Sequence, residues 1–142
     1  MMDAAVVDAS IAVKWVVNEP DSAQARRVSG IRLHAPDLLF LECANILWKK
    51  VRLGDLSRQE AAPRLAVLLR CPVQIVPGQD LLESALNLSL DLDHPVYDCV
   101  YLALALRRKI PLITADTRFA AAVRRKRRFA RFIQPLGEIG PS

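Results

Sequence analysis

Short apolar runs alternate along this sequence with longer stretches of helical periodicity, and this alternation leaves few folds open. Runs of a length suited to strands occupy residues 4–7, 32–35, 73–76, 112–114 and 132–133. One or two helical segments separate successive runs, and connections of that length join parallel strands. The sequence therefore predicts an α/β fold, in which a short central parallel sheet of about five strands has helices on both faces.

The intervening segments predict helices near residues 11–17, 21–30, 38–52, 57–69, 81–92 and 96–109, and a basic helix that begins at Thr117. Three of the helices have candidate caps: Ser10, Ser57 with Glu60 at capping-box spacing, and Asp80. Pro63 lacks an N–H group, so we expect it to kink its helix or to delay the start of that helix.

A length of 142 residues suits one domain, and we expect a single domain over residues 1–142. No apolar run approaches the roughly 18 residues that cross a membrane. The N-terminus has no basic segment of the kind found in secretory signals, so we expect a cytoplasmic protein. Cys43, Cys71 and Cys99 lack the spacing of zinc ligands and are expected to be buried free thiols.

Four acidic residues occupy positions that suit a functional site. Asp8 and Asp116 follow the ends of predicted strands, where ligands bind in open parallel sheets. Glu42 and Asp98 lie in the first turns of otherwise apolar helices. Taken singly, each has a structural alternative: the first two can cap the helices that follow, and the other two can interact with helix dipoles or buried arginines.

Taken together, the four acids predict a metal site. The predicted fold brings them to one edge of the sheet, where two carboxylates about 4 Å apart repel by roughly 4 kcal/mol. No Lys or Arg lies within a few residues of Asp8 or Asp98 to relieve that repulsion, whereas Mg²⁺ or Mn²⁺ suits such a cluster. Such an ion activates water for phosphodiester hydrolysis. His34 and His94 lie on unrelated segments, and we interpret His94 as a turn residue rather than a base.

The net charge of +5 is concentrated near the C-terminus, because residues 107–131 hold ten Lys or Arg and one acid. A basic segment beside an acidic cluster suits a nucleic-acid backbone. The candidates for RNA phosphate contacts or for docking of a protein partner are Arg124, Arg125, Lys126, Arg127 and Arg128. A solvated helix face is the alternative.

The four acids stand in four short motifs, which are Val6-Val7-Asp8-Ala9-Ser10, Pro36…Glu42-Cys43-Ala44-Asn45, Tyr97-Asp98-Cys99-Val100-Tyr101 and Leu112-Ile113-Thr114-Ala115-Asp116. In their order and with fitting gaps, these motifs resemble those of VapC-type PIN-domain toxins. The resemblance extends over nearly the whole chain. It implies a PIN fold and an Mg²⁺- or Mn²⁺-dependent endoribonuclease that is the toxin of a type II toxin–antitoxin pair.

The same resemblance implies roles for individual residues. The catalytic and metal-binding residues would be Asp8, Glu42, Asp98 and Asp116. The supporting polar residues would be Ser10, Asn45 and Thr114. Some relatives carry a further acid just after the fourth motif, where this chain has Thr117-Arg118-Phe119, so one or two metal ions per site both stay open. A homodimer and a small cognate antitoxin, whose tail covers the active site, are also implied.

Two other functions compete with this interpretation. A PIN scaffold can hold RNA or a protein partner without cleaving, but such scaffolds tend to lose the acids that are all present here. A DNA-directed nuclease of the flap endonuclease type needs long insertions that clamp DNA, and 142 residues leave no room for them.

Overall fold

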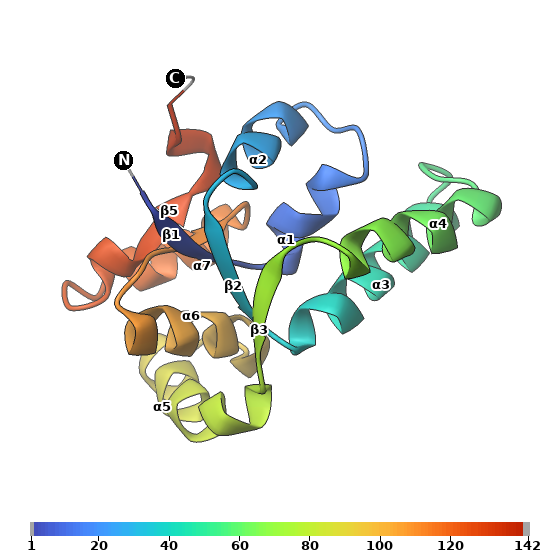
Figure 1. Cartoon of the computed structure of the whole chain (residues 1–142). Helices are drawn as coiled ribbons and strands as arrows, with labels where there is room; N and C mark the ends of the chain where they lie inside the picture. Colours follow the sequence, from blue (N-terminus) through green and yellow to red (C-terminus); the bar gives the residue numbers. More distant parts are fainter. Residues whose placement is uncertain (1, 141–142) are drawn as a thin grey trace.

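The strands form one parallel sheet (Figure 1). The computed structural model describes residues 2–140. In spatial order the strands are β3 (Val73–Val76), β2 (Arg32–Pro36), β1 (Ala4–Val7), β4 (Leu112–Thr114) and β5 (Ile133–Pro135). All neighbouring pairs run parallel. The predicted five-stranded α/β fold is therefore confirmed, and the first strand of the chain lies at the centre of the sheet.

Helices cover both faces of the sheet, because alternate strand residues point to opposite faces. The helices are α1 (Ala9–Ala12), α2 (Ser22–Val28), α3 (Leu38–Arg52), α4 (Arg58–Leu69), α5 (Leu82–Leu92), α6 (Val96–Arg108) and α7 (Thr117–Arg124). Short 3₁₀ turns are η1 (Val13–Trp15), η2 (Gly78–Leu81), η3 (Ala130–Phe132) and η4 (Leu136–Glu138). Val7 and Ile113 share a core with α2. Val6 and Leu112 share the other core with α3, α5, α6 and α7.

The helix starts differ from prediction at two places. Asp8, rather than Ser10, is the N-cap of α1, because its carboxylate accepts a hydrogen bond from the Ile11 N–H at 3.2 Å. Asp80 lies inside η2, and α5 begins at Leu82 without a side-chain cap. The capping box of α4 is present as predicted, with reciprocal bonds between Ser57 and Glu60.

Pro63 does not delay the start of its helix, which was one of the two effects expected of it. Helix α4 begins at Arg58 and continues through Pro63 to Leu69. The missing N–H leaves the Gln59 carbonyl without its helical partner. Both residues are exposed, so water can hydrate that carbonyl and the helix continues.

The basic helix is shorter than the cluster of cations implied. Helix α7 ends at Arg124, and residues 125–128 form a turn that leads to η3. Like charges at helical spacing destabilise a helix. In addition, Phe129 is buried, so the chain turns there to return to the core before β5. The prediction that this whole run lies on a helix is wrong.

Two further expectations concern thiols and membranes. Cys43 and Cys99 are buried free thiols, as predicted, but Cys71 is only half-buried, because it follows the end of α4 at the surface. Among residues 2–140, no helix combines the length and the apolar character that crossing a membrane requires.

Candidate active site

A pocket of about 440 Å³ lies at the carboxyl edge of the sheet. Four acidic side chains line it, and they are Asp8, Glu42, Asp98 and Asp116. Ser10 and Asn45 also line it, whereas Thr114 is fully buried at the end of β4. Within the described part of the chain, none of the lining residues is a lysine or an arginine. The parallel sheet thus brings together carboxylates from four separate segments.

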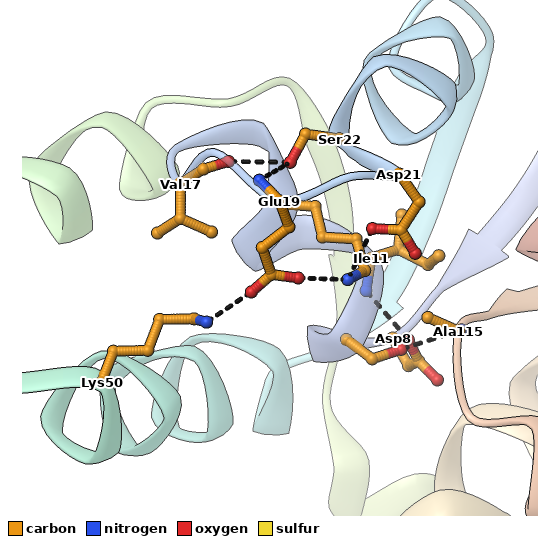
Figure 2. A network of polar contacts seen from close by, with 10 residues as sticks. Asp8, Ile11, Val17, Glu19, Asp21, Ser22, Lys50 and Ala115 are labelled. Atoms are coloured by element: carbon orange, nitrogen blue, oxygen red, sulfur yellow. Dashed lines mark hydrogen bonds and ion pairs between the residues drawn. The ribbon is translucent and has the colours of Figure 1, made fainter. Parts of the chain in front are cut away.

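Asp8 is the most buried of the four acids, with 6% of its surface exposed. It follows β1 directly, so the strand carries it to the edge of the sheet, and its Oδ1 accepts bonds from the Ser10 hydroxyl and the Ile11 N–H (Figure 2). Burial raises the pKa of Asp8 to about 6, although the Ser10 and Thr114 hydroxyls oppose that rise. The negative charge of Asp98 adds to it.

Two hydroxyl side chains accept hydrogen bonds from the backbone just after β4. The Ser10 hydroxyl donates to Asp8 and accepts a bond from the Ala115 N–H at 3.0 Å. The Thr114 hydroxyl oxygen accepts a bond from the Asp116 N–H at 3.1 Å. Asp116 in turn caps α7, since its Oδ1 accepts a bond from Phe119 N–H at 3.0 Å. Asp8 and Asp116 therefore do cap the helices that follow them, but capping uses only one oxygen of each carboxylate.

Glu42 has a partner that the sequence did not reveal. The hydroxyl of Tyr101, a fully buried residue of α6, donates a hydrogen bond to Glu42 Oε1 at 2.6 Å. Burial raises the pKa of Glu42, and the bond from Tyr101 limits the rise. A buried tyrosine needs a hydrogen-bond partner for its hydroxyl. Tyr101 lies one helical turn after Asp98, and this spacing could have indicated from the sequence that Tyr101 reaches the acidic site.

Asp98 also has a partner, which the sequence did not reveal. His94 Nε2 lies 2.6 Å from Asp98 Oδ2, one turn ahead on α6. The imidazole ring packs on Phe119 of α7, with ring centroids 4.6 Å apart. The residue does lie in a turn, since its backbone N–H bonds to the Ser89 carbonyl. Its side chain nevertheless contacts Asp98, one of the acids that line the pocket.

The donor set of the pocket fits a divalent cation by its chemistry. Each carboxylate offers hard oxygen ligands, which Mg²⁺ and Mn²⁺ prefer. In Glu42, Asp98 and Asp116 one oxygen bonds to a protein donor, and the second accepts no hydrogen bond from residues 2–140. No three acidic, histidine or cysteine side chains of the described residues converge closely enough to hold one ion. The carboxylates therefore have to draw closer together to coordinate a cation.

The five consecutive cations lie outside this pocket and differ in their surroundings. Arg124 makes a double hydrogen bond to Glu138, at 2.6 and 2.7 Å. Arg128 pairs with Asp91 at 2.9 Å and lies over the Phe129 ring. The three between them, residues 125–127, are exposed and form no ion pair with any residue of the described range 2–140. Three of the five are therefore available to a partner.

Comparison with known proteins places the chain in a family. Residues 5–124 match the PIN domain. The chain is 36% identical over 119 residues to "Ribonuclease VapC3" of Pyrobaculum aerophilum, which covers 81% of this chain and 91% of that relative. It is 34% identical over 116 residues to "Ribonuclease VapC12" of Mycobacterium tuberculosis, with 81% and 88% covered. Its fold is similar to a chain of a toxin–antitoxin complex from Klebsiella pneumoniae, with a TM-score of 0.64, 18% identity, and 95% and 99% covered.

The parallel sheet, the acidic edge and the match over residues 5–124 define a PIN domain, and the chain belongs to the PIN domain family. Within that family it belongs with the VapC ribonucleases, to which it is related over most of its length. The family resemblance of the four sequence motifs is thereby confirmed.

Proposed function

We propose that this chain is a divalent-cation-dependent endoribonuclease and the toxin of a toxin–antitoxin pair. Its relatives are named ribonucleases, and one structural neighbour is a toxin–antitoxin complex. The observation that carries the proposal is the pocket lined by four carboxylates, without a lysine or arginine among the described lining residues. We further propose that residues 1–142 act as one domain in the cytoplasm.

In this proposal the four carboxylates hold Mg²⁺ or Mn²⁺, which when bound neutralises phosphate charge and lowers the pKa of water. Asp8 and Asp116 contribute ligands from the ends of two strands. Glu42 and Asp98 complete the site and orient the attacking water, while Tyr101 and His94 hold these two carboxylates in place. Water attacks the phosphorus in line with the 3′ oxygen, so the P–O3′ bond breaks and leaves a 5′-phosphate and a 3′-hydroxyl.

Replacement of Asp8 by asparagine tests the proposal. The amide oxygen of Asn can still cap α1, so Asp8→Asn removes the negative charge while keeping the local hydrogen bond to Ile11. We expect the loss of RNA cleavage, of growth arrest and of Mn²⁺ binding measured by calorimetry. Asp55→Asn, which changes an exposed carboxylate beyond α3, is the matched control and should keep all three.

Three results would contradict the proposal. Wild-type activity that persists in EDTA would exclude the cation, and products with 2′,3′-cyclic phosphate ends would exclude attack by water. Tight RNA binding without any cleavage in Mn²⁺ would instead support the alternative of a non-catalytic PIN scaffold.

We also propose that a second copy of the chain covers one face to form a homodimer. Leu82, Leu86 and Leu90 lie on α5 at spacings of four residues, and all three are more than half exposed. Leu82, Leu41 and Tyr97 line a pocket of about 510 Å³ that shares Leu41 and Tyr97 with the acidic pocket. This apolar surface is therefore continuous with the active site, and solvent exposure of such a surface is unfavourable.

Light scattering on purified variants tests the homodimer. Leu86→Glu should convert the protein to a monomer, because a carboxylate would replace an apolar side chain in the interface. Val67→Glu, a change of an exposed apolar residue on α4, should leave the dimer intact. A dimer that survives Leu86→Glu with its dissociation constant unchanged would contradict this proposal.

For the antitoxin, we propose a tail that enters the acidic pocket with a basic side chain. Four carboxylates without a cationic neighbour on the lining attract such a group. The prediction is that a bound antitoxin lowers Mn²⁺ affinity, because both occupy the same carboxylates. Equal Mn²⁺ affinity of the free toxin and of the complex, measured by calorimetry, would exclude this binding mode.

A further inference from the structure

A largely buried ion-pair network lies outside the lining of the acidic pocket (Figure 2). The carboxylate of Glu19 lies between the ammonium groups of Lys14 and Lys50 and pairs with both. The three side chains are largely buried, with exposed fractions of 24%, 11% and 20% respectively. Ion pairs at the protein surface stabilise little, but removal of one partner from a buried pair is costly, because it leaves a charge without compensation.

Glu19 is itself fixed in place by its own loop. Its backbone N–H donates to the Ser22 hydroxyl oxygen at 2.9 Å, and that hydroxyl donates to the Val17 carbonyl at 2.8 Å. Asp21 adds a second carboxylate to Lys14, with 3.0 Å between Oδ1 and Nζ. The loop between η1 and α2 therefore presents the Glu19 carboxylate at a fixed position, and the two lysines adjust to it.

The two lysines belong to the elements that carry two of the pocket acids. Lys14 lies in η1, which continues directly from α1, and Asp8 caps α1. Lys50 lies in the last turn of α3, whose second turn carries Glu42. Helices α1 and α3 pack against each other within one core. Glu19 therefore joins these two elements at a distance from the pocket, and its removal would leave Lys50 without an ion-pair partner among residues 2–140.

We propose that Glu19 is a positioning residue, which holds α1 against α3 and so sets the separation of Asp8 and Glu42. This inference rests on the proposed cation-dependent function. Mg²⁺ binds its ligands at about 2.0–2.1 Å and tolerates little deviation from octahedral geometry. Without Glu19, Lys14 keeps only Asp21 and Lys50 has no ion-pair partner among residues 2–140, so no carboxylate joins the two lysines. A small shift of either helix then separates the carboxylates that have to converge on one ion.

The test compares Glu19→Gln with the wild type for Mn²⁺ affinity, by calorimetry, and for RNA cleavage. A misplacement of 1 Å can lower a rate by about a hundredfold, and we expect a smaller shift to weaken Mn²⁺ binding and to lower kcat by about tenfold. The KM for RNA should stay unchanged. Glu60→Gln is the control, because it likewise removes one negative charge from an ion pair, here with Arg64 within α4.

Second-site changes separate positioning from a general loss of stability. Lys50→Gln alone removes the ion pair between Lys50 and Glu19 but keeps the pair between Lys14 and Glu19. It should therefore weaken Mn²⁺ binding less than Glu19→Gln does. The double variant Glu19→Gln/Lys50→Gln removes the unpaired charge as well and should recover part of the Mn²⁺ affinity. A structural role alone would lower the melting temperature without this pattern in the affinity for Mn²⁺.

The outcomes keep the inference and the proposed function apart. If Glu19→Gln and Lys50→Gln lower the melting temperature but retain wild-type Mn²⁺ affinity and kcat, Glu19 only stabilises the fold and the inference is wrong. If the wild type itself neither binds Mn²⁺ nor cleaves RNA, it is the proposed function that is wrong.

Discussion

The raised pKa of Asp8 predicts that this carboxyl group contributes less to the stability of the cation-free protein as the pH rises from 4 to 7. In the folded protein burial raises the pKa of Asp8 from 3.8 to about 6. The folded state therefore binds a proton more tightly than the unfolded state does. The stabilisation from that proton is intact below the unfolded value and is lost as the pH rises through the folded value.

The size of the effect follows from the shift. A difference of about two pKa units corresponds to about 3 kcal/mol in the free energy of unfolding. Solvent screening reduces this little, because only 6% of Asp8 is exposed. Asp8→Asn has no proton to lose and keeps an oxygen that can cap α1. The free energy of unfolding of Asp8→Asn, taken relative to that of the wild type, should therefore increase by up to about 3 kcal/mol between pH 4 and pH 7.

Urea denaturation in EDTA, at several pH values across this range, measures the difference. Asp55→Asn is the control, since it changes an exposed carboxylate and should follow the wild type at every pH. Millimolar Mn²⁺ at pH 7 should stabilise the wild type and not Asp8→Asn, by mass action. A difference between Asp8→Asn and the wild type that does not change with pH would refute the reasoning, because the buried charge would then carry no cost.

Further predictions concern partners of the site and the surface. Tyr101→Phe leaves a half-buried carboxylate without its donor, so kcat/KM should fall and stability should drop by about 1–3 kcal/mol. Ser29→Ala, which removes the hydroxyl of an exposed residue just after α2, should keep both, and equal effects of the two changes would contradict the role of Tyr101. Replacing residues 125–127 by Gln should weaken RNA binding and reduce its salt dependence, by about 0.7 in slope per lost phosphate contact. Arg124→Gln should change RNA affinity less, because Arg124 already pairs with Glu138. An unchanged salt slope in the triple variant would show that the turn only solubilises the protein.

Much of the fold followed from local patterns in the sequence. The apolar runs at residues 4–7 and 112–114 are strands of the sheet, and the acids that follow them lie at its carboxyl edge. This worked because strand length and side-chain alternation depend on neighbouring residues. Because the strands are parallel and the connections between them are right-handed, the acids that follow these strands have to meet at the same edge of the sheet. The identity of the four pocket acids followed from the same logic.

Local sequence patterns failed where tertiary packing determines the bounds of a helix. The run of cations after Arg124 carries a helical charge pattern, but the need to bury Phe129 and to form β5 ends α7 there. A delayed helix start at Pro63 was also open, yet α4 begins at Arg58, five residues before it. The end of α7 was missed because a helix end depends on what the flanking chain has to contact.

The partners of the acids are likewise a property of the folded chain. Tyr101 lies 59 positions from Glu42, and the side chains meet only because α3 and α6 begin at the same edge of the sheet. Lys50 and Glu19 are 31 positions apart, and the ion pair forms only when α3 packs beside α1. No spacing rule links residues this distant, since their proximity is set by the sum of many core contacts. Sequence patterns thus determine which carboxylates reach the pocket, and packing determines which donors hold them and how far apart they lie.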